Sequence, residues 1–391
     1  MSNYIFYFDE SFHTRNISKS SIKDTDYFNS YISTGLGFKI RDKYDILNKY
    51  ENFEATYKKI YTTNEELKSD IVKQKNYISG IASFNKNACN LYYDYFKILN
   101  ENEIIYYVSI IDKLEYLLLN CSYQFPKFIN IKAMIYSIVK LINTYKPENI
   151  IEDIMNKDSK LIDDLKDFLK KQIEVNGNIP LKESENSAMK NIYYFLESID
   201  SSKIKFEFEY AFTYQGFKKM INELGIKNVH LVIDKEGSNK ILNAAKKEGF
   251  RDSEQLDSKL STGVRMSDMF CGFIARMMRA IYKSTYNDPT IPYKEKHLLP
   301  IEWFNLKKES FGLYKEVAKF IKKYVDVYYG TYCSLYSDLF TEFVALVYYF
   351  DKFENFDKYD EVKTEQHFKD CNNEMINRVA KDIKRIEKSY F

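Results

Sequence analysis

Two adjacent carboxylates directly follow an apolar run near the start of the chain. In "YIFYFDES", Tyr4–Ser11, five apolar or aromatic residues precede Asp9 and Glu10. The pattern recurs in "NVHLVID", where Asp234 ends a second apolar run. Open α/β sheets bind ligands at the carboxyl ends of their strands, and neighbouring carboxylates repel each other unless a proton or a cation intervenes. The two strand ends are therefore a candidate cation site, although a single acid there also serves as a helix N-cap.

A third acid interrupts an otherwise apolar or small face of a predicted helix. In "TGVRMSDMFCGFIARMMRA", Asp268 shares one helical stripe with Val264, Cys271, Ala275 and Met278. An ionised carboxylate that is buried without a partner costs several kcal/mol, so Asp268 needs a metal ion, a cation or a hydrogen-bonded group. A metal site and a salt bridge with Arg265 or Lys259 are both compatible with the pattern. The small residues Gly272 and Ala275 would let this helix press onto a sheet and carry Asp268 over the strand ends.

The elements that must position these acids follow from the periodicity of the apolar residues. Strands are expected at Tyr4–Phe8, Tyr31–Ile40, Glu103–Ile111, Lys203–Tyr210 and Asn228–Asp234, with a short strand or loop at Glu254–Gly263. The second strand should pair with the first as a hairpin, with Gly35 and Gly37 at bulges or at close backbone approaches. Helices are expected at Asn48–Lys75, Asn76–Leu99, Tyr214–Leu224, Ser238–Lys247 (closed by Gly249) and Val264–Lys283.

This order of elements predicts an α/β protein with one core that a helical segment interrupts. We expect residues 1–112 and 203–283 to form a mixed-sheet core, residues 113–202 a large helical insertion, and residues 284–391 a helical C-terminal appendix. Glu66, in "EELKSD", is a fourth candidate acid, which by itself is typical of an exposed helix face.

Four motifs, taken in order, resemble a bacterial RNase H-like family that is catalogued as a domain of unknown function, number three thousand eight hundred. They are "FYFDES", "ELKSD", "HLVID" and "LDSKLSTGVRMSDMFCGFIAR". Members of that family open with a Tyr-x-Asp-Glu-Ser-Gly strand and close with a Ser-Lys…Gly-x-Gln-x-Ala-Asp helix. The resemblance covers about half of the chain, and it departs from the family pattern at Phe12 (Gly), Arg265 (Gln) and Ser267 (Ala).

The resemblance implies an RNase H-like fold and a metal-dependent nuclease that hydrolyses DNA or RNA, in phage defence or a mobile element. It implies four catalytic acids, namely Asp9, Glu66, Asp234 and Asp268. The expected ligands of the metal are Asp9, Glu10, Asp234 and Asp268. Oxygen ligands without histidine or cysteine favour Mg²⁺ or Mn²⁺ over zinc. The expected contacts to the nucleic acid are Lys68, Lys259 and Arg265.

Other readings of the same residues remain open. A nuclease-like core that is catalytically inactive, and that binds nucleic acid or acts as a scaffold, is the main alternative. A phosphatase with an aspartyl nucleophile is less well supported, because a second acid is commonly needed two residues later. Ser11 stands there after Asp9, and Asp234 has Glu236 there but lies late in the chain and not on the opening strand. Basic residues near the last motifs could hold a phosphate backbone or form solvated helix faces; they are Lys240, Lys246, Lys247, Arg251, Lys259, Arg265, Arg276 and Arg279.

Composition limits the class of protein. With 58 basic and 56 acidic residues, a nucleic acid would have to be held by a local basic patch. The five cysteines are scattered without a Cys-x-x-Cys pair, which fits a reducing compartment better than a disulfide framework. The start of the chain lacks a basic segment before its apolar run, and the apolar stretch Leu339–Phe350 is short and contains Glu342. We therefore expect no signal peptide, no membrane span and a cytoplasmic location.

Overall fold

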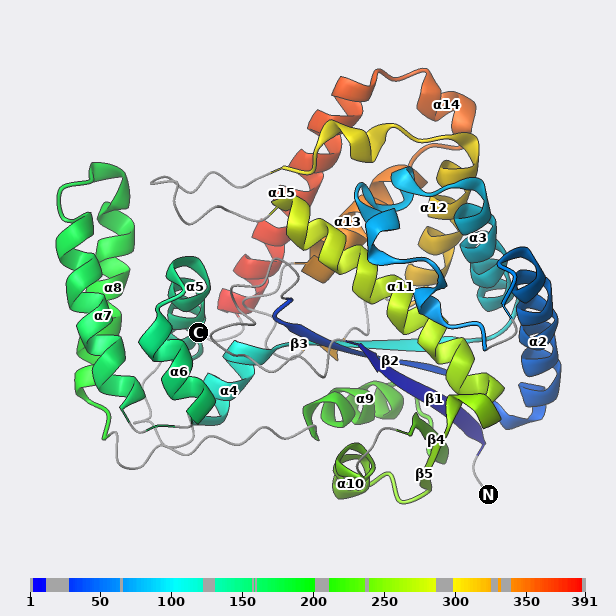
Figure 1. Cartoon of the computed structure of the whole chain (residues 1–391), viewed down its shortest axis with the longest axis horizontal. Coiled ribbons are helices and arrows are strands. Elements are labelled where there is room, and N and C mark those ends of the chain that lie inside the picture. The colour runs from blue at the N-terminus through cyan, green and yellow to red at the C-terminus, as the bar shows by residue number, and fades with distance from the viewer. Residues whose placement is uncertain are drawn as a thin grey trace.

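Figure 1 shows the computed structural model of the chain, in which a mixed sheet is covered by helices on both faces and a group of helices lies to one side. It describes residues 3–11, 28–63, 66–121, 131–156, 158, 160–200, 211–235, 239–285, 298–324, 330–331 and 339–388. The predicted strand Lys203–Tyr210, and Phe12 at the first departure from the family pattern, lie outside these residues.

The sheet contains six strands in the order β5-β4-β1-β2-β3-β6. They are β1 (Tyr4–Ser11), β2 (Ser30–Lys39), β3 (Ile105–Asp112), β4 (Val229–Asp234), β5 (Ser253–Leu256) and the two-residue β6 (Gly330–Thr331). Only β2 runs against the others, because it pairs antiparallel with both β1 and β3 while the remaining pairs are parallel. The carboxyl ends of the five parallel strands therefore meet at one edge. The predicted mixed α/β core is confirmed.

Two glycines let β1 and β2 approach each other closely. The pairing from Tyr4↔Lys39 to Ser11↔Ile32 is regular and has no bulge. A Cβ atom at Gly35 would lie 2.6 Å from the ring of Phe8, and one at Gly37 would overlap the ring of Phe6. Of the two roles expected for these glycines, close approach is the one found.

The two faces of the sheet bury different sets of side chains. Because neighbouring residues of a strand point to opposite faces, Phe6 and Phe8 pack with α9 (Ala211–Glu223) and α10 (Lys240–Lys247) on one face. Ile5 and Tyr7 face the long helix α11 (Thr262–Thr285) on the other. In Figure 1 these helices lie on opposite sides of the strands.

Helix α11 is held against β1 by Gly263 and Ser267. A Cβ atom at Gly263 would overlap the ring of Tyr7, and the Ser267 hydroxyl donates a hydrogen bond of 2.9 Å to the Tyr7 carbonyl oxygen. Helix α11 packs on the sheet as expected, but Gly272 lets it approach Ser69, in the segment before α3, and not a strand, because a Cβ atom there would overlap Ser69.

The expected helices Asn48–Lys75 and Asn76–Leu99 are correct only in part. The chain forms α2 (Lys43–Ile60) and α3 (Lys86–Glu101), and short 3-10 turns lie between them at Ser69–Ile71, Gln74–Tyr77 and Gly80–Ser83. Helix α2 is followed by Thr62 in the left-handed region (φ 52°), which a β-branched residue rarely adopts and which stops a helix. Glu66 therefore lies in an irregular segment and not on a helix.

The helices between β3 and α9 build a core of their own. They are α4 (Lys113–Cys121), α5 (Ile131–Tyr145), α6 (Glu148–Asn156), α7 (Leu161–Asn176) and α8 (Glu183–Glu197). Their buried side chains, from Leu114 to Ile199, form a cluster separate from the sheet, and Figure 1 places these helices beside the rest of the molecule. These helices thus bury an apolar cluster of their own between β3 and α9.

The C-terminal helices pack into the main core. They are α12 (Lys308–Ile321), α13 (Leu339–Asp351), α14 (Phe356–Asp360) and α15 (Thr364–Lys388). Phe320 and Phe343, for example, belong to the same buried cluster as the α11 face of the sheet. The C-terminal helices thus pack against α3 and α11. No helix in the described ranges combines the length and the apolar character that crossing a membrane requires.

Candidate active site

The register of two parallel strands brings the first two acids side by side. Strands β1 and β4 pair from Tyr4↔Val229 to Phe8↔Ile233, so Asp9 and Asp234 are the next residues on neighbouring strands. Both follow the alternation that points Tyr7 and Val232 toward α11. The two carboxylates therefore lie at the carboxyl end of the sheet and on the same face.

Asp268 is brought to this end of the sheet by α11. It lies one residue after Ser267, which is hydrogen-bonded to β1, and its carboxylate is held by Ser69. The backbone N–H of Ser69 donates to Oδ2 at 2.7 Å, and its hydroxyl donates to Oδ1 at 2.9 Å. The Arg276 guanidinium donates to the Ser69 oxygen at 3.4 Å. Asp268 is thus oriented by hydrogen bonds.

The charges of these three acids act on one another. Burial raises the pKa of Asp9 well above its usual range, and the nearby negative charges of Asp268 and Asp234 raise it further. Burial also raises the pKa of Asp268, against the hydrogen bonds from Ser69 and the positive charges of Arg276 and Lys68. We call Asp9, Asp234 and Asp268 the acidic cluster. It is a concentration of negative charge that a bound cation would stabilise.

Glu10 is not part of this cluster. It is the next residue along β1, so its side chain points to the opposite face of the sheet, where its charge adds to the effect of burial in raising the pKa of Tyr214. The side chain of Glu10, which was expected to bind the metal with the three aspartates, thus points away from them, although its charge still adds to the rise in the pKa of Asp9.

Glu66 and Lys68 form an ion pair at the border of the cluster. Lys68 Nζ lies 2.8 Å from Glu66 Oε1. Burial acts to raise the pKa of Glu66, but hydrogen bonds from Lys68 and Ser258 outweigh it, so the pKa is lowered. The pKa of Lys68 is raised, first by its hydrogen bond to Glu66 and also by the charges of Asp268 and Asp234. Lys68 is therefore a counter-charge for both Glu66 and the cluster.

Arg265 is engaged within the fold. Its Nε and Nη2 atoms donate to the two carboxylate oxygens of Glu54 at 2.7 and 2.8 Å, and Nη1 donates to the Ser258 carbonyl oxygen at 2.8 Å. This fork-like pairing uses the geometry that guanidinium groups favour. The structure therefore does not present Arg265 to a ligand, and Asp268 pairs with neither Arg265 nor Lys259.

Lys259 is exposed to solvent. It belongs to the 3-10 turn Ser258–Leu260, whose first residue is close enough to Glu66 to help lower the pKa of that carboxyl group. The side chain of Lys259 is exposed and makes no ion pair with any residue that the structure describes. Its neighbour Leu260 is 84% exposed. This turn therefore presents a free cation beside the acidic cluster.

The oxygen ligands of the cluster suit a hard divalent cation such as Mg²⁺ or Mn²⁺. Glu66 Oε2 is buried and has no hydrogen-bond partner among the described residues, so it is a further donor atom that an ion would satisfy. Among the described residues, however, no three His, Cys, Asp or Glu side chains lie close enough together in their present positions to hold one ion. The donor set thus fits the metal chemically, and side-chain rotation is needed to complete a coordination sphere.

Ser69, and the inward contact of Arg276, were not anticipated from the sequence. Ser69 follows Lys68 directly in the "ELKSD" motif, and Arg276 lies two helical turns after Asp268 on the same face of α11. Arg276 was expected among residues that could hold a phosphate backbone, but its guanidinium turns inward to Ser69. Its i+8 spacing from Asp268 was the available signal.

Comparisons with known proteins give no further guide. No family model matches the sequence, and no curated protein or solved structure matches it either.

Proposed function

We propose that this protein is a divalent-metal-dependent nuclease that hydrolyses phosphodiester bonds of DNA or RNA. The observation that carries the proposal is the acidic cluster itself. Asp9 and Asp234 lie side by side just past the last paired residues of the adjacent parallel strands β1 and β4, and α11 brings Asp268 close enough for its charge to raise the pKa of Asp9. Lys68 and Arg276 offset part of the repulsion among these carboxylates, but the pKa of Asp9 and of Asp268 is still raised, and a bound metal ion would stabilise their ionised forms.

The arrangement of the sheet supports the RNase H-like part of the proposal. An antiparallel meander, β1-β2-β3, is extended on the β1 side by the parallel strands β4 and β5. This is a mixed-sheet core of the kind that the motif resemblance implies. The same resemblance is the basis for a role in phage defence or in a mobile element, and the scattered cysteines are the basis for a cytoplasmic location.

Asp9, Asp234 and Asp268 would hold Mg²⁺ or Mn²⁺, with Glu66 as a further ligand. When bound, such an ion activates water and stabilises the leaving oxygen of a phosphodiester. Ser69 orients Asp268 through its two hydrogen bonds. Lys68 limits the repulsion among the acids, and Lys259 offers a positive charge to a phosphate group of the nucleic acid.

A catalytically inactive nucleic-acid-binding or scaffolding protein is the second candidate. The observation that favours it is the Glu66–Lys68 ion pair, because an ammonium group there already supplies part of the positive charge that a metal ion would bring. The two candidates differ in whether the acidic cluster binds Mn²⁺.

The test combines metal binding and activity. Mn²⁺ binding should be measured by calorimetry and by paramagnetic relaxation, and hydrolysis should be screened on labelled single- and double-stranded DNA and RNA. Asp268→Asn should lose both the Mn²⁺ binding and any metal-dependent cleavage. Asp45→Asn, which changes an exposed acid of α2 that pairs with Lys49, is the matched control. Mn²⁺ binding without cleavage of any substrate would favour the inactive alternative, and absence of Mn²⁺ binding would end the nuclease proposal.

A further inference from the structure

Lys68 is placed at the border of the acidic cluster by a fixed stretch of backbone. Its neighbours in the chain, Leu67 and Ser69, are 0% and 4% exposed. The Ser69 N–H donates to the Asp268 carboxylate at 2.7 Å. The Lys68 carbonyl oxygen accepts a hydrogen bond of 3.0 Å from the Ile71 N–H. The backbone of Lys68 is therefore held beside Asp268, and the side chain is the part that can change its position.

The ammonium group of Lys68 balances several carboxylates at once. It lies 2.8 Å from Glu66 Oε1. The hydrogen bond to Glu66 raises the pKa of Lys68, and the negative charges of Asp268 and Asp234 add to the rise. Glu66, Asp234 and Asp268 are also ligands of the proposed metal ion. Because like charges repel, the ammonium group and a metal ion compete for these carboxylates.

The two partners of this ion pair differ in how freely they can move. The side chain of Glu66 is 12% exposed, whereas that of Lys68 is 53% exposed. A lysine side chain is a flexible four-carbon stem that ends in a strongly hydrated charge. Lys68 can therefore turn outward, while Glu66 stays at the border of the cluster. A metal ion that takes the Glu66 carboxylate would send the ammonium group toward the solvent, from which a nucleic acid approaches.

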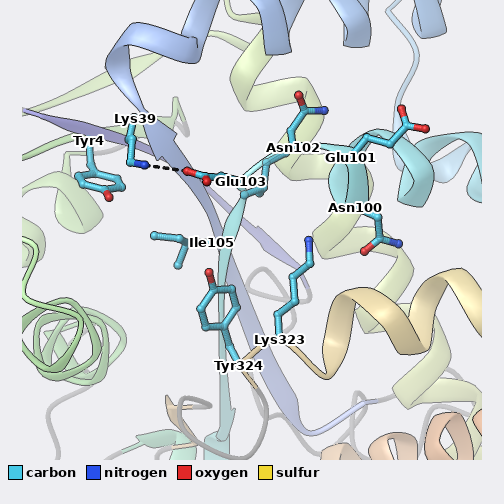
Figure 2. Close-up of a pocket in the computed structure, with 10 residues that line it drawn as sticks. Tyr4, Lys39, Asn100, Glu101, Asn102, Glu103, Ile105, Lys323 and Tyr324 are labelled. Carbon is cyan, nitrogen blue, oxygen red and sulfur yellow. Dashed lines mark hydrogen bonds and ion pairs between the residues drawn. The ribbon is translucent and has the colours of Figure 1, made fainter.

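The ion pair of Lys39 and Glu103, near the opposite end of β1, has no such surroundings. Lys39 Nζ lies 2.7 Å from Glu103 Oε2, as the dashed line in Figure 2 marks. Lys39 pairs in the sheet with Tyr4, which is five residues before Asp9 on β1. That separation corresponds to roughly 16 Å at about 3.3 Å per residue. Lys39 therefore balances a carboxylate remote from the acidic cluster, and it is a matched control for Lys68.

We propose that Lys68 takes the place of the metal ion while the site is metal-free, and that metal binding moves its ammonium group from Glu66 to a phosphate group of the nucleic acid. This inference rests on the proposed function, because it concerns the metal ion of the same site. One charged group then has two roles in turn: it stabilises the gathered acids before the ion binds, and it contacts the substrate afterwards. Since the ion and the phosphate group both draw Lys68 away from Glu66, metal and nucleic acid should each favour binding of the other.

The first experiment measures Mn²⁺ binding to the full chain by calorimetry, without nucleic acid. Lys68→Met should bind Mn²⁺ about tenfold more tightly than the unaltered protein, because a positive charge near a divalent ion is removed. Lys68→Arg keeps the charge and should bind Mn²⁺ about as weakly as the unaltered protein. Lys39→Met removes the control ion pair and should leave the Mn²⁺ affinity unchanged. Without metal, Lys68→Met should also melt at a lower temperature, since the acids have lost a counter-charge.

The second experiment measures binding of labelled phosphorothioate oligonucleotides of DNA and of RNA, which resist hydrolysis. In the presence of Mn²⁺, Lys68→Met should weaken this binding a few-fold, because the displaced ammonium group is missing. In EDTA, Lys68→Met should change the affinity little, because Glu66 holds the ammonium group of the unaltered protein. An equal loss with and without Mn²⁺ would show a fixed phosphate contact and overturn the inference, and so would the absence of binding to either oligonucleotide.

The Mn²⁺ measurements separate failure of this inference from failure of the nuclease proposal. Equal Mn²⁺ affinities of Lys68→Met and the unaltered protein would overturn the inference and leave the nuclease proposal standing. Mn²⁺ binding by Lys68→Met alone would support the inference and favour the inactive alternative. Absence of Mn²⁺ binding in both proteins would end both proposals. If Lys68→Met unfolds at the working temperature, Lys68→Gln serves in its place, with the thermal melt as the check on folding.

Discussion

Asp9 and Asp112 both follow the apolar run of a buried strand near the same edge of one sheet, yet their surroundings differ. Asp112 is 2% exposed and accepts hydrogen bonds from Asn29 at 2.6 Å, from the Leu114 N–H at 3.0 Å and from the Glu115 N–H at 2.9 Å. It caps the start of α4. Asp9 is 7% exposed and faces the charges of Asp268 and Asp234 instead.

This difference separates a structural acid from a functional one. The fold supplies three hydrogen-bond donors to Asp112, which offset part of the cost of burying its carboxylate. Around Asp9 the fold adds like charges to burial, which is unfavourable unless another species is bound. An acid at the end of an apolar strand is thus ambiguous in sequence, and its neighbours in space decide its role.

The strongest test of this contrast replaces each aspartate by alanine. Asp112→Ala removes the cap of α4 and leaves the Asn29 amide without its acceptor, so it should lower the free energy of unfolding by about 1–3 kcal/mol. Asp9→Ala removes a repelled charge, so its free energy of unfolding should be unchanged or higher. Urea denaturation without metal measures both.

The loss of cleavage activity should be large in Asp9→Ala and small in Asp112→Ala, the reverse of the order expected for stability. Asp9→Ala should reduce metal-dependent cleavage at least about 100-fold, in line with the loss of an essential group, while folded Asp112→Ala should cleave nearly as well as the unaltered protein. If Asp9→Ala proves the less stable variant and keeps its activity, the assignment of the two aspartates is reversed.

The pH dependence of stability sharpens the contrast further. Burial raises the pKa of Asp112 to about 7, against its hydrogen bonds. An unfolded aspartate releases its proton near pH 4, so between about pH 4 and 7 the folded state binds more protons and the free energy of unfolding falls as the pH rises, by at most about 4 kcal/mol. Asp112→Ala should lose this part of the slope.

Magnesium separates the contributions of the two acids. The raised pKa of Asp9 gives a slope of the same sign, but a bound cation would cancel it, because the cation favours the ionised carboxylate. In Asp112→Ala, added Mg²⁺ should therefore reduce the pH dependence of the free energy of unfolding that Asp9 causes. In Asp9→Ala, it should leave unchanged the pH dependence that Asp112 causes. A Mg²⁺ effect that is the same with and without Asp9 would contradict the assignment.

The strands were predictable because a buried strand has a strong apolar pattern. Tyr4–Phe8, Tyr31–Ile40 and Asn228–Asp234 were each placed within three residues of the observed ends. The helix expected at Asn48–Lys75 was wrong at its second half, since helical spacing of apolar residues does not reveal a left-handed Thr62. The segment that carries Glu66 and Ser69 owes its shape to packing against α11, which periodicity cannot show.

A site residue could be predicted from the sequence where the pattern of a single strand end or a single helix face was enough to reveal it. Asp9, Asp234 and Asp268 were found as acids that break apolar patterns, and the pairing of β1 with β4 then brings two of them together. The pairing of Arg265 with Glu54 joins two helices far apart in sequence, so it could not be read from spacing. Sequence also gave no reason to separate Asp112 from Asp9.

A smaller effect is expected from Ser69, which donates hydrogen bonds to Asp268 as backbone amides do to Asp112. Ser69→Ala removes the 2.9 Å hydroxyl bond to Asp268 and keeps the N–H bond. Cleavage should fall about tenfold, as for one lost hydrogen bond to a charged group, mainly in kcat and in the Mg²⁺ concentration needed for half-maximal rate. Ser198→Ala, which removes a local hydroxyl bond in the helical insertion, is the matched control. A change confined to the KM for nucleic acid would point to substrate contact instead.

The smallest effect concerns Lys259, which lies at the Asp9 end of the sheet edge and carries an exposed, unpaired charge. Because the acidic cluster repels a polyanion, a cation at this turn should strengthen nucleic-acid binding locally, next to the cluster. Lys259→Ala should weaken nucleic-acid binding a few-fold and reduce the slope of log Kd against log salt by about one phosphate contact, with the melting temperature unchanged. Lys308→Ala, an exposed lysine at the start of α12, should change none of these. Equal losses in both variants would mean that general positive charge, and not the turn beside Asp9, holds the nucleic acid.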